Sequence, residues 1–168
     1  METTILVALG SNRRHGRHGP PERVLLAAMA ALAAAGLRIV CRSRIRPTPP
    51  LGPGGRRFAN AAVAVVTALP LPAVLALLKR IERDFGRKRG RRWGDRVLDL
   101  DILGAGDTVI AAPGLTVPHP ALAARRFVLD PLLDIAPEWR HPVLGATVRQ
   151  LRFRAMRPKA RACFGKGP

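Results

Sequence analysis

The chain has 168 residues, with 29 lysines and arginines against 11 aspartates and glutamates, a formal net charge of +18. This length is enough for one domain with a real core, and the charge predicts an anionic partner: a nucleic acid, a membrane surface or a nucleoside triphosphate. Cys41 and Cys163 lack metal-ligand spacing, which argues against a zinc site or a disulfide framework and favours a reducing cytoplasm. The longest apolar run, 24–37, is too short to span a bilayer, so we expect no membrane anchor.

The order of elements follows from hydrophobic periodicity and from the positions of proline and glycine. The predicted order is strand 5–9, helix from Pro20 to Gly36, strand 37–46, strand 60–67, helix from Pro72 to Gly86, strand 97–103, a short strand at 108–110 and a short helix at 121–126. The leading β-α-β-β-α-β order predicts an α+β fold of the ferredoxin-like, split βαβ type, an antiparallel sheet with helices on one face. We expect a single domain over 1–168, with 143–168 as a basic C-terminal tail.

The segment 86–103 joins a cationic loop to a pair of acidic residues. Five arginines and one lysine between Arg87 and Arg96 precede Asp99 and Asp101. Alternate side chains of a strand share a face, so the two carboxylates project together, with Cα atoms roughly 7 Å apart, while the leucine and isoleucine neighbours point into the core. Guanidinium groups bind phosphate directly, and paired carboxylates bind it through Mg²⁺. The segment therefore predicts a nucleotide phosphate site, the alternative being a solvated acidic edge strand.

Short sequence blocks spread over most of the chain carry further information. They are Leu9-Gly10-Ser11-Asn12, Thr48-Pro49-Pro50-Leu51-Gly52, Phe58-Ala59-Asn60, Arg92-Trp93-Gly94-Asp95-Arg96, Leu98-Asp99-Leu100-Asp101-Ile102, Val117-Pro118-His119-Pro120 and Arg125-Arg126-Phe127-Val128-Leu129. In this order they resemble the 6-hydroxymethyl-7,8-dihydropterin pyrophosphokinase family of folate biosynthesis. The resemblance implies transfer of pyrophosphate from ATP to the hydroxymethyl group of the pterin, release of AMP, and two bound Mg²⁺ ions.

The resemblance also implies a role for individual residues of this chain. The catalytic set is Arg87, Arg96, Asp99 and Asp101, of which Asp99 and Asp101 are also the metal ligands. The ATP-binding set is Glu82, Arg87, Arg89, Arg92, Trp93, Arg96, His119 and Arg125. The pterin-binding set is Thr48, Pro49, Leu51, Phe58, Asn60, Asp99 and Phe127. Two positions depart from the family pattern: Phe58 stands where relatives often carry tyrosine, and Lys79 where an uncharged polar side chain near the adenine is familiar.

Residue type alone leaves alternatives open. Phe58 and Phe127 could be core residues, His119 a structural histidine and Glu82 a solvated helix residue. The loop 15–19, with two histidines, is expected to be solvated rather than metal-binding.

For the whole chain, the alternative is a small basic ferredoxin-like RNA-binding module. The chain contains no tyrosine and lacks the strand-aromatic pattern of such modules, so we do not expect a nucleic acid partner. We expect a monomer in the cytoplasm whose substrates are ATP and the pterin.

Overall fold

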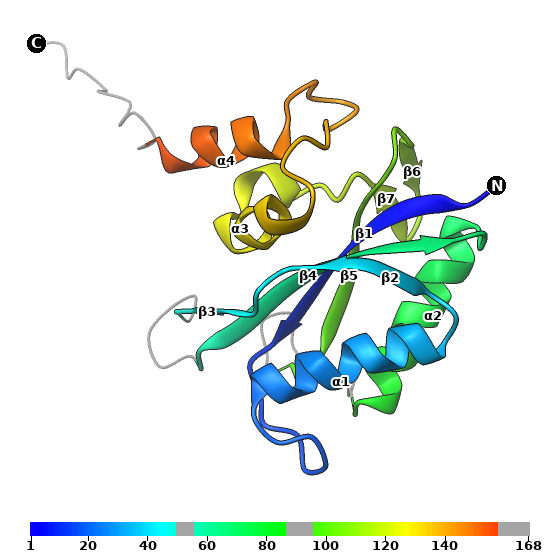
Figure 1. Cartoon of the computed structure of the whole chain (residues 1–168), viewed down its shortest axis with the longest axis vertical. Helices are drawn as coiled ribbons and strands as arrows, with labels where there is room; N and C mark the ends of the chain where they lie inside the picture. Colours follow the sequence, from blue (N-terminus) through cyan, green and yellow to red (C-terminus); the bar gives the residue numbers. More distant parts are fainter. Residues whose placement is uncertain (50–55, 87–95, 158–168) are drawn as a thin grey trace, which may run out of the picture.

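The structure, a computed structural model, describes residues 1–49, 56–86 and 96–157. In chain order (Figure 1) its elements are β1 (Thr3–Ser11), α1 (Pro21–Ala34), β2 (Arg38–Arg42), β3 (Arg46–Thr48), β4 (Phe58–Thr67), α2 (Leu71–Asp84), β5 (Asp99–Ala105), β6 (Ile110–Ala112), β7 (Leu115–Val117), the 3₁₀ helix η1 (Leu122–Ala124), α3 (Arg126–Ile135) and α4 (Val148–Met156). The predicted elements are present with shifted ends, except that the strand predicted over 37–46 is divided into two. No helix among these residues is long and apolar enough to cross a membrane.

An antiparallel sheet forms the centre of the molecule, with strand order β2-β4-β1-β5 and with β3 pairing along β4. β1 and β4 pair without a break from Thr3 opposite Thr67 to Ser11 opposite Ala59. These two strands are apolar almost throughout, as expected for central strands that are covered on both faces.

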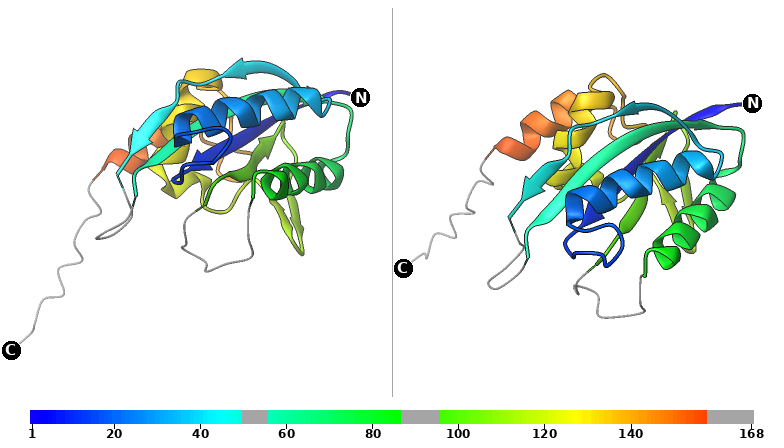
Figure 2. Two further views of the ribbon diagram at one scale, coloured as in Figure 1. Left: turned by 90° about the horizontal axis from the view of Figure 1, so that it is seen from below. Right: turned by 60° about the horizontal axis from the view of Figure 1, so that its bottom comes forward.

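The helices α1 and α2 cover one face of the sheet, side by side (Figure 2). Each helix has a proline in its first turn, where the missing N–H costs nothing. Gly36 and Gly86 follow the helix ends with φ angles of 89° and 82°, which only glycine adopts without strain. The apolar side of each helix joins the main core against the odd-numbered residues of β1 and β4.

The opposite face of the sheet is also covered, which corrects the expectation of helices on one face only. α3 and α4 pack over Leu6, Ala62 and Ala64, forming a second apolar cluster (Figure 1). The residues expected as a basic tail include α4, which begins with a capping box between Thr147 and Gln150. The reason is that two-sided apolar central strands require cover on both faces.

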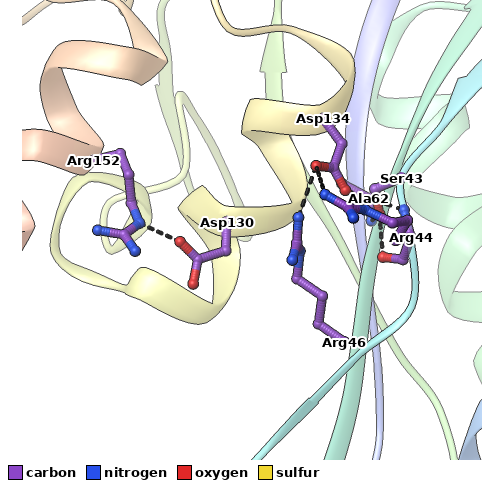
Figure 3. Close-up of polar contacts among 7 residues, drawn as sticks. All are labelled: Ser43, Arg44, Arg46, Ala62, Asp130, Asp134 and Arg152. Atoms are coloured by element: carbon purple, nitrogen blue, oxygen red, sulfur yellow. Dashed lines mark hydrogen bonds and ion pairs between the residues drawn. The ribbon is translucent and has the colours of Figure 1, made fainter.

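The single strand predicted over 37–46 is two strands, β2 and β3, separated at Ser43. The Ser43 backbone N–H donates to the Ala62 carbonyl at 2.9 Å, and the Ala62 N–H donates to Ser43 Oγ at 2.9 Å. The Ser43 hydroxyl thus takes the place of a backbone carbonyl as acceptor for β4 (Figure 3). The chain can therefore bend here and still pair with β4.

Asp134 of α3 holds this bend in place. Its carboxylate accepts hydrogen bonds from the Arg44 backbone N–H at 3.2 Å and from Arg46 Nη2 at 2.7 Å (Figure 3). Partial desolvation alone would raise the pKa of Asp134, but the bonds from Arg44 and the charge of Arg46 outweigh it, so the pKa is lowered. Asp134 therefore anchors the segment that leads into β3.

The histidine loop between β1 and α1 is partly packed rather than fully solvated. His15 and His18 stack with ring centroids 4.7 Å apart, and His18 stacks on Phe85 at 5.0 Å. His15 Nδ1 accepts the backbone N–H groups of Arg17 and His18, which closes the loop locally.

Candidate functional site

Asp99 and Asp101 lie on one face of β5, as predicted from their spacing. Both are half-buried, whereas Leu98 and Leu100 are fully buried on the other face. β5 pairs with β1 so that Asp99 lies opposite Gly10 and Asp101 opposite Ala8. Because residues 8 and 10 of β1 are small, no long side chain of that strand covers the two carboxylates.

Arg96 fixes the start of β5. Its backbone N–H donates to Asn12 Oδ1 at 2.7 Å, and the Asn12 N–H donates to the Arg96 carbonyl at 3.1 Å. Arg96 Nη1 donates to Asp99 Oδ2 at 2.7 Å. Asn12, which our sequence reasoning gave no role, thus ties the end of β1 to the arginine. Its signal was the asparagine directly after a buried strand.

Glu82 and Lys79 of α2 lie against the outer side of β5. Glu82 is only 1% exposed, so the alternative of a solvated helix residue is wrong. Glu82 Oε1 accepts the Leu100 backbone N–H at 2.7 Å, and Lys79 Nζ donates to Glu82 Oε1 at 2.8 Å. Lys79 Nζ also lies 3.6 Å from Asp101 Oδ1. Lys79, one of the two positions that depart from the family pattern, therefore belongs to the site.

The paired carboxylates fit Mg²⁺ by the chemistry of their donors. No group of three or more histidine, cysteine, aspartate or glutamate side chains suited to a metal occurs among the described residues. Mg²⁺ typically takes one or two carboxylates and completes its shell with phosphate oxygens and water, so two half-buried carboxylates suffice.

A second group of predicted residues lies on the same sheet face. Asn60 is buried, and its Nδ2 donates to Thr48 Oγ1 at 2.7 Å, which joins β4 to β3. Phe58, half-buried, lies opposite Thr48. Asn60 pairs with Gly10, which on its other side pairs with Asp99. Strand registry therefore places Asn60, Gly10 and Asp99 in one row across the sheet, with Asn60 and Asp99 roughly 10 Å apart at two strand spacings.

His119, Arg125 and Phe127 come from the segment between β7 and α3. The His119 backbone N–H donates to the Leu103 carbonyl at 2.9 Å, which puts this histidine beside β5. His119 Nδ1 accepts the Ala121 N–H at 3.1 Å, so the neutral ring carries its proton on Nε2. Arg125 Cζ lies 5.7 Å from the centroid of the half-buried Phe127 ring.

Some predicted site residues lie outside the described part of the chain, namely Arg87, Arg89, Arg92, Trp93 and Leu51. Pro49 is described and exposed, directly after β3. The structure thus brings the described members together around one sheet face and its β5 edge.

These features define an α+β protein with a site suited to a divalent cation and an anionic substrate. Residues 6–137 match the model of the 7,8-dihydro-6-hydroxymethylpterin-pyrophosphokinase family, and the chain belongs to this family.

The chain is similar to curated proteins and to solved structures. It is 42% identical over 139 residues to a 2-amino-4-hydroxy-6-hydroxymethyldihydropteridine pyrophosphokinase of Pseudomonas aeruginosa, covering 82% of this chain and 83% of that protein. It is 40% identical over 135 residues to a mitochondrial folate synthesis bifunctional protein of Arabidopsis thaliana, covering 80% of this chain and 24% of that protein.

The crystal structure of Plasmodium falciparum HPPK-DHPS matches with a TM-score of 0.70 at 16% identity, covering 92% of this chain and 45% of that chain. At this identity the match supports the fold alone. This chain spans less than half the length of the Plasmodium falciparum chain.

Proposed function

We propose that this protein transfers pyrophosphate from ATP to the hydroxymethyl group of 6-hydroxymethyl-7,8-dihydropterin, releasing AMP, as a step of folate biosynthesis. Its family membership supports the reaction. The observation that carries the assignment to this site is the row of Asn60, Gly10 and Asp99, with Asp101 on the same face. One surface thus holds polar groups for a heterocycle beside carboxylates for a metal–nucleotide complex.

Asp99 and Asp101 are the proposed metal ligands. Bound Mg²⁺, of which we expect two ions, supplies neutralisation of the triphosphate charge and alignment of its oxygens. Support comes from the shared face of the two carboxylates and from their hard oxygen donors. In the chain itself, Arg96 and Lys79 balance the charges of these carboxylates.

The proposed ATP contacts surround this pair. Arg96, beside Asp99, can turn its guanidinium to phosphate oxygens, because a planar fork binds two oxygens at once. His119, held with Nε2–H as its donor, lies beside β5. Further proposed contacts are Arg87, Arg89, Arg92, Trp93, Arg125 and Glu82. For Glu82 the buried bond to the Leu100 N–H and the bond from Lys79 favour an indirect role, through the position of β5.

The proposed pterin pocket lies at the β3–β4 end of the row. The Asn60 amide can present a donor and an acceptor to the edge of a flat heterocycle, and its bond to Thr48 fixes its orientation. A Cβ at residue 10 would lie 3.4 Å from Asn60 Oδ1, so Gly10 lies directly beside this buried amide. Phe58 and Phe127, both half-buried, are the proposed stacking residues, and Pro49 and Leu51 complete the set.

The finer description of the fold is also a proposal. The sheet order β2-β4-β1-β5 and the antiparallel pairing support a ferredoxin-like split βαβ core. α3 and α4 are then additions on the second face. A single domain over 1–168, a monomeric state and a cytoplasmic location are proposed from the sequence.

The test is to incubate the protein with ATP, Mg²⁺ and the reduced pterin alcohol and to separate the products. We expect AMP and the pterin pyrophosphate in equal amounts, each dependent on both substrates. ADP in place of AMP would contradict attack at the β-phosphorus. Salt-dependent binding to arbitrary RNA without AMP release would favour the RNA-binding alternative.

A further inference from the structure

Two side chains of α2 close the outer edge of β5 at the centre of the candidate metal site. β5 is the last strand in the sheet order, and the backbone N–H and C=O of Leu100 point to its outer side, where α2 lies. Glu82 Oε1 accepts the Leu100 N–H at 2.7 Å, and Lys79 Nζ donates to the Leu100 carbonyl at 2.9 Å. The Glu82 carboxylate and the Lys79 ammonium group, one helical turn apart, thus make the two hydrogen bonds that a neighbouring strand would otherwise make.

The same ammonium group lies between two carboxylates. Lys79 Nζ is 2.8 Å from Glu82 Oε1 and 3.6 Å from Asp101 Oδ1. Glu82 is buried, and a buried carboxylate is costly without a charged or hydrogen-bonding partner. Asp101 is partly exposed. The positive charge of Lys79 therefore interacts with two carboxylates: that of Glu82, which is structural, and that of Asp101, a proposed metal ligand.

We propose that Lys79 and Glu82 form an edge clamp that positions β5 and sets the affinity of Asp101 for its metal. The proposal rests on the proposed function, because it takes Asp101 as a metal ligand. The positive charge of Lys79 opposes a divalent cation at Asp101. The Glu82 carboxylate attracts the Lys79 ammonium group toward α2 and so reduces its effect on Asp101. Lys79 and Glu82 are thus positioning residues with opposite electrostatic effects on one site.

The clamp predicts shifts of opposite sign for two neutral substitutions. Lys79→Gln removes the positive charge and keeps a donor, so we expect metal affinity to rise by roughly three- to tenfold. Glu82→Gln keeps an acceptor for the Leu100 N–H but leaves the Lys79 charge to act on Asp101 alone. We expect metal affinity to fall by about the same factor. A merely structural role would weaken binding in both variants.

The experiment is a Mn²⁺ titration of the full-length chain at about 0.15 M salt, with free Mn²⁺ followed by electron paramagnetic resonance. The nucleotide is α,β-methylene-ATP, whose bridging carbon prevents pyrophosphate transfer, so the dissociation constant is measured without turnover. Arg80→Gln is the matched control, because Arg80 is an exposed basic residue beside Lys79 on the same helix. Thermal unfolding of each variant is recorded in parallel.

Opposite shifts, with the control unchanged, support the clamp. Shifts in the same direction, or shifts below twofold in both variants, overturn it. If Glu82→Gln does not fold, Lys79→Arg replaces it: this variant keeps the charge, and the tightening seen with Lys79→Gln should be absent. Formation of AMP by the wild-type protein is assayed separately, so failure of the proposed function is distinguished from failure of the clamp.

Discussion

Replacing Asp99 by asparagine separates two roles for its carboxylate. In the structure Asp99 accepts a hydrogen bond from Arg96 at 2.7 Å, with side chains 24% and 33% exposed. As an ion-pair partner alone, Asp99 would matter only to the local conformation of the chain. As a metal ligand, it is required for the reaction itself. Asparagine preserves the shape and one oxygen, so the substitution removes only the negative charge, on which both roles depend.

The two roles predict effects of different size. A partly exposed ion pair contributes up to about 1 kcal/mol to stability, which in a chain of this length lowers the Tm by about 2–4 °C. Loss of one of two carboxylate ligands should reduce the rate of AMP formation about 10³-fold, equivalent to about 4 kcal/mol of transition-state stabilisation. We therefore expect Asp99→Asn to remain folded and to lose nearly all turnover.

The assay measures initial rates of AMP release at saturating ATP, pterin and Mg²⁺, with thermal unfolding of the same samples. Asp107→Asn is the control, because Asp107 lies in the exposed turn after β5 and makes the same change of charge. A rate for Asp99→Asn within about tenfold of the wild-type rate would refute the metal assignment. A large decrease in Tm would indicate that the role of Asp99 is mainly structural.

Three further substitutions test the pocket, the bend and the packing. Asn60→Ala should raise the KM for the pterin about tenfold or more, with the KM for ATP little changed, because a buried amide that orients the heterocycle is lost; equal changes in both constants would contradict the pocket. Asp134→Asn should lower stability at pH 7 by about 1 kcal/mol. Because the folded-state pKa of Asp134 is lowered, its contribution is complete above the unfolded-state pKa of about 4 and is lost as pH falls through the folded pKa. Thermal unfolding at pH 7 and near pH 2.5 should therefore show the difference from wild type disappearing in acid, and a constant difference would exclude the ionic explanation. Gly104→Ala should cost about 1–3 kcal/mol of stability, because the added Cβ would lie 2.5 Å from Trp139 Cζ2; an unchanged Tm would mean that the indole moves freely.

The sequence predicted those features that depend on local periodicity. The shared face of Asp99 and Asp101 follows from the two-residue repeat of a strand, and the structure confirms it. Pro21 and Gly36 indicated the two ends of α1, and Pro72 and Gly86 indicated those of α2. α3 was missed because Pro131 lies inside it, and a proline in a helical pattern usually indicates an end. α4 was missed because its segment is rich in arginine and was interpreted as a basic tail, and the capping box at Thr147 was not recognised.

What the sequence alone determined is therefore the leading β-α-β-β-α-β order of elements, the paired acidic residues and, through the resemblance, the family. Tertiary structure decided which distant residues meet. Strand registry put Asn60, Gly10 and Asp99 in one row, and the packing of α2 brought Lys79 to Asp101. The physical reason is that the repeat of a helix or strand is set by neighbouring residues, whereas registry and helix docking depend on how the two apolar faces of the whole sheet are covered.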